Sequence, residues 1–176
     1  MSTPAALPYV IRHYEENRPL DGLRTPELFA VAAARLWVAP HLKPGRKHPD
    51  WRQGFRAAGM SEQAMRAFDA LWRIVAASAH RSLDIRCSPC PALSPDEALL
   101  LQIVDTLQAG HDDAAAELLE RWLPPTARRI ALEPARAFAI AMADARLLLT
   151  PPSRQAEAIP LEWFRKLVRR AETVLH

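Results

Sequence analysis

The chain has 176 residues, of which 49% are hydrophobic and 24% charged, and its net charge is +3. This length and composition predict one soluble globular domain that needs neither disulfides nor metal to bury its core. With 16 Pro but only 5 Gly, the chain has few positions for glycine-built ligand loops, and the absence of G-x-G-x-x-G, G-x-x-x-x-G-K and G-x-S-x-G patterns excludes the Rossmann, P-loop and hydrolase classes.

The sequence carries no sign of export or of a membrane span. Its apolar runs are far shorter than the roughly 20 residues that a membrane helix needs. Arg12, His13, Glu15 and Glu16 lie where a signal peptide would have its apolar core. We therefore expect a cytoplasmic protein.

The residue usage predicts an all-α fold. Ala, Leu and Arg dominate, β-branched residues are sparse, and apolar residues do not alternate with period two. The prolines should force corners between helices of unequal length, so we expect a single domain of about six to eight helices packed irregularly or orthogonally.

The first strong helix start is Thr25-Pro26-Glu27, which offers a hydroxyl N-cap, a proline at the first helical position and an acid near the positive end of the helix dipole. The helix 26–39 is apolar on nearly every side, and Arg35 is its only interior charge. We expect it to be the most buried helix. Pro40 should end it, and the basic loop 41–49 follows.

Residues 53–71 resemble the helix-turn-helix of many bacterial regulators. Ala58-Gly59-Met60-Ser61 supply the small residue, the turn and the N-cap that this motif uses between a helix at 50–58 and a helix at 61–79. The resemblance implies a helical corner, and it makes a DNA-binding regulator one functional alternative.

DNA binding would require dimerisation and a basic surface at this corner. The exposed face of the second helix instead alternates in charge. Glu62 with Arg66 and Asp69 with Arg73 are predicted i, i+4 pairs typical of a solvated helix. The candidate DNA contacts are Ser61, Gln63, Arg66, Arg52, Arg46 and Lys47.

Residues 80–93 are predicted to form a loop. Ser94-Pro95-Asp96-Glu97 has the pattern of a capping box and predicts a helix that runs to Ala109. Another helix should begin at Asp112 and end at Pro124. Pro134 should divide the next stretch into helices 126–132 and 133–149.

We divide the chain into a helical core domain at 1–150, a proline-rich linker at 151–160 and an amphipathic C-terminal helix at 161–176. Apolar residues gather on one side of that helix and basic residues on the other. We expect it to pack on the core. The linker would also let it dock on a partner or exchange between two copies, which would give a homodimer.

The most distinctive chemical motif is Cys87-Ser88-Pro89-Cys90. Two thiols at this spacing can share one metal ion or form a redox disulfide. Zinc would need further ligands, and the nearest donors are His80 and His111, at no recognised spacing. Proline between the cysteines resembles thioredoxin-type motifs, but the next helix starts only at Ser94. A metal-binding or redox thiol protein is therefore an alternative to two simple loop thiols.

Catalytic patterns are otherwise scarce, because the six histidines form no H-E-x-x-H or E-x-x-H pair. We therefore expect a non-enzymatic protein-binding or accessory factor with no cofactor, zinc at the cysteines being the alternative. Its partner would be a protein that contacts the loop 80–93 and the terminal helix. The candidate partner contacts are Pro89, Pro91, Leu93 and Trp163.

Overall fold

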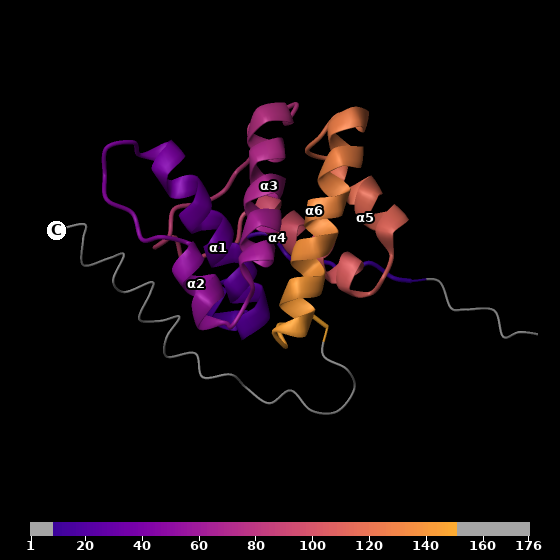
Figure 1. Cartoon of the computed structure of the whole chain (residues 1–176), viewed down its shortest axis with the longest axis horizontal. Coiled ribbons are helices and arrows are strands. Elements are labelled where there is room, and N and C mark those ends of the chain that lie inside the picture. Colours follow the sequence, from indigo (N-terminus) through magenta and orange to yellow (C-terminus); the bar gives the residue numbers. More distant parts are fainter. Residues whose placement is uncertain (1–8, 151–176) are drawn as a thin grey trace, which may run out of the picture.

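The computed structural model describes residues 9–150, so the predicted linker 151–160 and helix 161–176, with Trp163, lie outside the described residues. Residues 9–150 form helices without any strand, which confirms the all-α prediction (Figure 1). The helices are a short 3-10 turn at Leu20–Gly22, α1 (Thr25–Leu42), α2 (Arg52–Ala57), α3 (Glu62–Ser78), α4 (Pro95–Gln108), α5 (Asp112–Leu119) and α6 (Pro125–Asp144). Within this range, no helix has the length and apolarity needed to cross a membrane.

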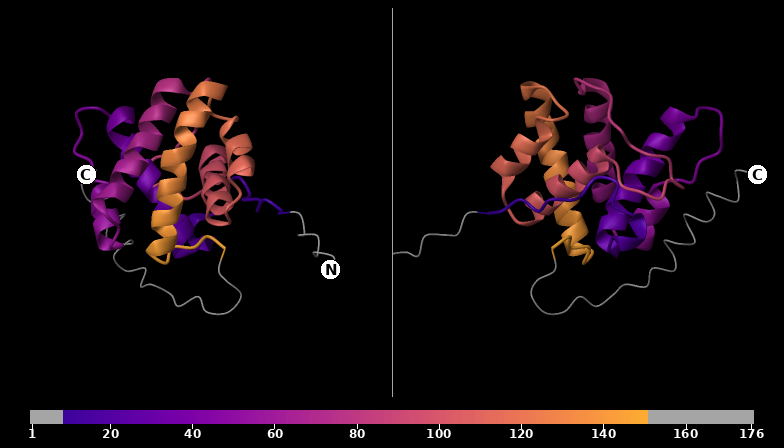
Figure 2. Two further views of the ribbon diagram at one scale, coloured as in Figure 1. Left: turned by 45° about the vertical axis from the view of Figure 1, so that its right-hand side comes forward. Right: turned by 180° about the vertical axis from the view of Figure 1, so that it is seen from behind.

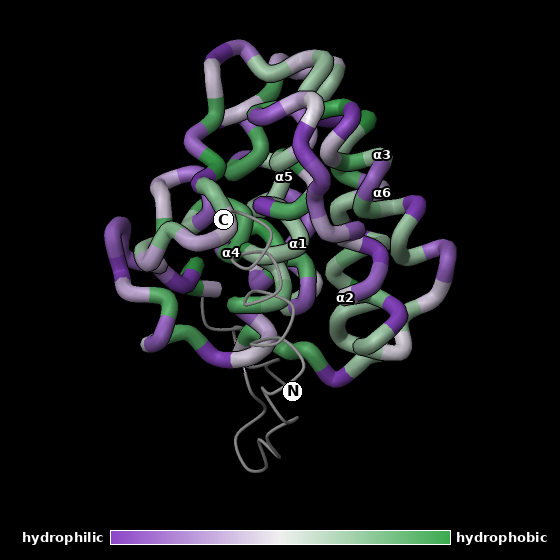
Figure 3. The backbone as a smooth tube through the Cα atoms, turned by 90° about the vertical axis from the view of Figure 1, so that its left-hand side faces the viewer, coloured by the Kyte–Doolittle hydropathy of each residue, from purple (hydrophilic) through white to green (hydrophobic). Residues whose placement is uncertain are grey.

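The centre of the fold is α4, of whose 14 residues twelve are buried. It packs against α1, α5 and α6, while α3 and α6 run side by side (Figures 1 and 2). In Figure 3 the stretch labelled α4 is mostly hydrophobic and lies inside the other helices. The prediction that helix 26–39 is the most buried one is wrong, because nine of the 18 residues of α1 are buried, against twelve of the 14 residues of α4.

Three phenylalanines join α2, α3 and α6. The ring of Phe68 lies 5.1 Å from that of Phe55 and 4.9 Å from that of Phe138, measured between centroids. All three side chains are fully buried. Tilted aromatic pairs of this kind contribute about 0.5–1.5 kcal/mol each beyond the burial of their surface. The cluster therefore fixes the predicted corner between α2 and α3 against the rest of the fold.

Two of the predicted helix starts are confirmed in detail. Ser94 Oγ accepts the N–H of Glu97 at 3.1 Å, and the Glu97 carboxylate accepts the N–H of Ser94 at 2.9 Å, which completes a capping box. Ser61 Oγ accepts the N–H of Ala64 at 3.2 Å and caps α3. Local sequence is sufficient for these caps, since each satisfies donors within its own first turn.

The start of α1 is capped differently from the prediction. The N-cap residue is Arg24, and Thr25 is already helical. The Glu27 carboxylate accepts the N–H of Arg24 at 2.7 Å. Glu27, the acid predicted to lie near the positive end of the helix dipole, thus also satisfies the backbone N–H of Arg24. The Thr25 hydroxyl is not needed as a cap.

Two prolines that were predicted to end helices lie inside them. The helix α1 continues through Pro40, and α6 is one helix through Pro134 instead of two. Each proline removes one backbone hydrogen bond and crowds the carbonyl four residues earlier, at a cost of about 3 kcal/mol. In α6 the burial of Ala131, Ala135 and Phe138 on either side of the proline offsets that cost.

Candidate thiol–disulfide site

The loop between α3 and α4 carries both cysteines, as predicted, and the structure joins Cys87 and Cys90 in a disulfide. Their Cα atoms are 5.5 Å apart, and the Cys90 N–H donates to the Cys87 carbonyl at 3.0 Å. The disulfide therefore closes a tight turn. Cys87 is an exposed residue and Cys90 is half-buried.

A buried arginine from α1 holds this turn from beneath. Arg35, which is 2% exposed, donates through Nη1 to the carbonyl oxygens of Cys87 at 3.2 Å and Cys90 at 2.6 Å. Its Nη2 donates to the carbonyl of Ala92 at 2.9 Å. The backbone positions of both cysteines are thus fixed by a side chain that is distant in sequence.

The charge of Arg35 is balanced by Glu97 in the first turn of α4. The two side chains form a bidentate pair, with Nε to Oε1 at 2.7 Å and Nη2 to Oε2 at 2.8 Å. A guanidinium has five N–H donors, and Arg35 makes five hydrogen bonds. Glu97 also accepts the backbone N–H groups of Arg86 and Ser94. Such complete pairing is what makes a buried ion pair tolerable.

The neighbouring acid, Asp96, holds the beginning of the same loop. Its carboxylate accepts from Arg81 at 2.5 and 2.9 Å, from the N–H of Asp84 at 2.7 Å and from the indole of Trp122 at 2.8 Å. Burial by itself raises the pKa of Asp96, but these hydrogen bonds together lower it by more, so the pKa lies below its usual range. Two adjacent acids of α4 therefore fix both halves of the cysteine loop.

The end of the loop pairs with the N-terminal segment. Asn17 and Leu20 donate their N–H groups to the carbonyls of Leu93 at 2.9 Å and Pro91 at 2.8 Å. Leu93 is fully buried, so its prediction as a partner contact is wrong: its side chain is needed in the core. The other two predicted contacts of this loop, Pro89 and Pro91, are exposed beside the cysteines.

The predicted metal ligands do not come together. His80 follows α3 and is exposed, and the ring of His111 stacks on Tyr9 with centroids 3.8 Å apart. No group of three or more His, Cys, Asp or Glu side chains suited to a metal ion occurs in residues 9–150. Zinc binding would also need the cysteines as thiolates, because a disulfide has none to offer. It stays a prediction for the reduced protein.

The predicted DNA-contact residues are only partly on one surface. Ser61 caps α3, and the two residues of that helix, Gln63 and Arg66, are exposed. Arg46 and Lys47 are exposed in the connection between α1 and α2. The sixth candidate is Arg52, the first residue of α2. Its guanidinium lies over the neighbouring Trp51 ring, 4.4 Å from the ring centre.

The face of α3 that would enter a groove is partly occupied by α1. Asp69 accepts the indole N–H of Trp37 at 2.8 Å and pairs with Arg73 at 2.6 Å. The predicted pair of Asp69 and Arg73 is thus confirmed, whereas Glu62 lies 3.9 Å from Arg56 and not beside Arg66 as predicted. Burial by itself raises the pKa of Asp69, but the hydrogen bonds from Arg73 and Trp37 lower it by more, so the pKa lies below its usual range. DNA binding stays a prediction.

Sequence reasoning had identified the cysteines but missed the residues that position them. Asp96 and Glu97 were recognised only as part of a capping-box pattern. The available signal was Arg35, a single charge inside an otherwise apolar helix. No family model, curated protein or solved structure matches this chain. The chemical assignment therefore depends on the geometry of the cysteine loop.

Proposed function

We propose that this protein is a partner-binding accessory factor that exchanges its Cys87–Cys90 disulfide with the thiols of another protein. The supporting observation is an exposed residue, Cys87, in a disulfide whose backbone carbonyls are held by the buried Arg35. The partner is then recognised by the surface around the turn, which includes the exposed Pro89 and Pro91.

Exchange begins at Cys87, the more exposed of the two residues. A partner thiolate attacks Cys87 Sγ and forms a new S–S bond, while the bond to Cys90 breaks and its electron pair leaves on Cys90 Sγ, which takes a proton from water. A second partner thiolate then attacks the partner's own sulfur and releases Cys87 as a thiolate. Two electrons have passed from the partner dithiol, now a disulfide, to the Cys87–Cys90 pair.

The loop is arranged to survive this change. The hydrogen bonds from Arg35 reach the carbonyl oxygens of both cysteines and do not involve their sulfurs. The turn is therefore held when the disulfide is open, and the two thiols stay close enough to reoxidise. A high effective concentration of one thiol at the other is what makes such a pair reversible.

The position of the pair favours an accessory role over catalytic turnover. Catalytic C-x-x-C pairs gain thiolate character from the N-terminus of a helix. Here α4 begins only at Pro95, and its first-turn acids Asp96 and Glu97 are engaged by the loop. We therefore expect one exchange per binding event.

The test uses two matched single-cysteine variants of the full chain, each reacted as the thiol with 5,5′-dithiobis(2-nitrobenzoate). Cys90→Ser leaves the exposed thiol and should form its mixed disulfide about tenfold faster than Cys87→Ser, which leaves the half-buried one. In glutathione buffers, the two thiols of the wild-type protein should be oxidised and reduced together. Equal rates for the two variants, or a reduced protein that does not reoxidise, would overturn the proposal. Elemental analysis of the reduced protein tests the zinc alternative.

A further inference from the structure

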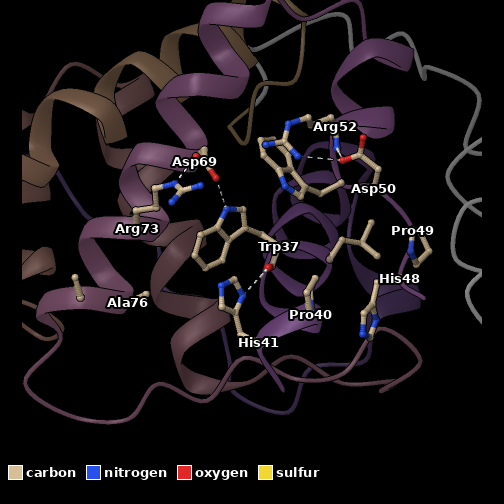
Figure 4. A pocket seen from close by; sticks show the side chains of 13 residues that line it. Trp37, Pro40, His41, His48, Pro49, Asp50, Arg52, Asp69, Arg73 and Ala76 are labelled. Atoms are coloured by element: carbon tan, nitrogen blue, oxygen red, sulfur yellow. Dashed lines mark hydrogen bonds and ion pairs between the residues drawn. The ribbon is translucent and has the colours of Figure 1, made fainter. Parts of the chain in front are cut away.

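A pocket of about 670 Å³ opens between the end of α1, the connection to α2 and the middle of α3. This is a usual volume for a small-molecule site. In Figure 4 the side chain of Trp37 stands in the middle, with Asp69 and Arg73 on one side and Asp50 and Arg52 on the other. No residue of the cysteine loop lines this pocket, so it is a different site from the disulfide.

We propose that this pocket binds a small organic anion, one acidic group carried on a flat apolar ring. The apolar part of the ligand would lie on buried side chains that still face the pocket, Leu36, Trp37 and Trp51. His41 already stacks on Trp37 with ring centroids 4.7 Å apart. Trp72 also stacks on Trp37, at 6.0 Å between centroids, so a flat ligand ring would take the place of the exposed His41 on the indole.

The acidic part of the ligand is selected by guanidinium N–H donors that the two aspartates of the pocket do not use. Asp69 accepts from Trp37 and from Nε of Arg73, and Asp50 accepts from the N–H and Nη1 of Arg52. Within residues 9–150, each arginine thus uses only some of its guanidinium N–H donors to bind its aspartate. The remaining guanidinium N–H groups suit a carboxylate, sulfonate or phosphate, whose oxygens accept charge-assisted hydrogen bonds.

The surroundings of the pocket add to its preference for anions. The connection between α1 and α2 carries three exposed cations, Lys43, Arg46 and Lys47, without any acid before Asp50. The two arginines and two aspartates of the wall cancel in formal charge, and the same connection lines the pocket through His48 and Pro49, so its cations add positive charge to the segment that borders the pocket. Positive charge near a cleft raises the local concentration of anions.

The experiment titrates the oxidised full chain with two fluorescent probes of nearly the same shape. One is 1-anilinonaphthalene-8-sulfonate, and the other is N-phenyl-1-naphthylamine, which lacks the sulfonate. The variant is Arg73→Gln, whose side chain is 70% exposed and whose loss should leave the fold intact. The matched control is Arg66→Gln, an exposed residue of the same helix that does not line the pocket.

We expect the wild-type protein to bind the sulfonate probe, and Arg73→Gln to weaken that binding about tenfold, the loss of one charge-assisted bond. Arg66→Gln should change it less than about twofold. Neither variant should alter binding of the neutral probe. Equal effects of the two variants on the sulfonate probe, or an equal loss of the neutral probe in Arg73→Gln, would overturn the proposal, as would the absence of sulfonate binding. Far-UV circular dichroism confirms that both variants are folded.

Discussion

Replacing Arg35 with alanine is the sharpest test of how the cysteine loop is held. The change removes a bidentate ion pair and three further hydrogen bonds at once. Glu97 is 0% exposed, so it would be left as a buried carboxylate without its counter-charge. Breaking one partner of such a pair costs about 3–5 kcal/mol of unfolding free energy. Since domains are stable by only about 5–15 kcal/mol, the variant should be close to unfolding.

Two companion variants give the scale. Arg73→Ala removes a pair whose arginine is 70% exposed, and such a pair contributes little to stability because solvent screens it. Arg35→Lys keeps a positive charge for Glu97 but cannot direct five hydrogen bonds, so its cost should fall between the two. The order of the three costs therefore reports burial and geometry together.

The measurement is urea unfolding of the oxidised protein at neutral pH, followed by far-UV circular dichroism. A transition for Arg35→Ala shifted by only as much as that of Arg73→Ala would refute the reasoning, since it would mean that Glu97 is not left charged in the core. Alkylation of the thiols in the folded variants adds a second readout. Without the hydrogen bonds from Arg35 to the carbonyl oxygens of the turn, the Cys87–Cys90 disulfide should be easier to reduce in Arg35→Ala than in wild type.

Three further predictions address other parts of the fold. The pKa of Asp96 is lower in the folded protein than in the unfolded chain because Arg81 and Trp122 donate to its carboxylate. Its contribution to stability is therefore present above about pH 4 and is lost as the pH falls through the folded pKa. Urea unfolding across the acid range should show a shallower loss of stability with falling pH for Asp96→Asn than for wild type, and an equal loss would contradict this. Phe138→Ala should cost about 3–5 kcal/mol in the same assay because its ring is fully buried in the aromatic cluster, and a cost below about 1 kcal/mol would mean that the cluster is not the core. Gly59→Ala should cost about 1 kcal/mol although open space surrounds the position, since its φ is +70°; a stabilised variant would rule out that backbone angle.

Several elements of the fold could be predicted because their signals are local. The caps at Ser61 and Ser94 are built within one turn, and the corner at Gly59 needs only a residue that accepts a positive φ. Helix ends at prolines were less predictable. Pro134 carries a local penalty that the burial of the flanking helix offsets, and the sequence around it does not state how much surface the rest of the chain will cover.

The candidate site divides in the same way. The C-x-x-C spacing alone marked Cys87 and Cys90 as a pair able to react together. Which of the two is exposed, and what holds their carbonyl oxygens, depends on Arg35, a residue 52 and 55 positions away along the chain. The pocket beside Trp37 was not predicted at all, because it is formed by three segments whose residues share no sequence pattern.

By itself, the sequence determined that this protein is helical, where most of its helices begin, and that two thiols lie close together in one loop. Helix propensity, capping and spacing are properties of neighbouring residues, and they act before the chain has packed. Only the tertiary structure decided that α4 and not α1 is the centre, that Leu93 is core and not surface, and that Arg35 and Glu97 meet across 62 residues. Those outcomes depend on long-range contacts, in which a local preference of a few kcal/mol is outweighed by the surface that the whole fold buries.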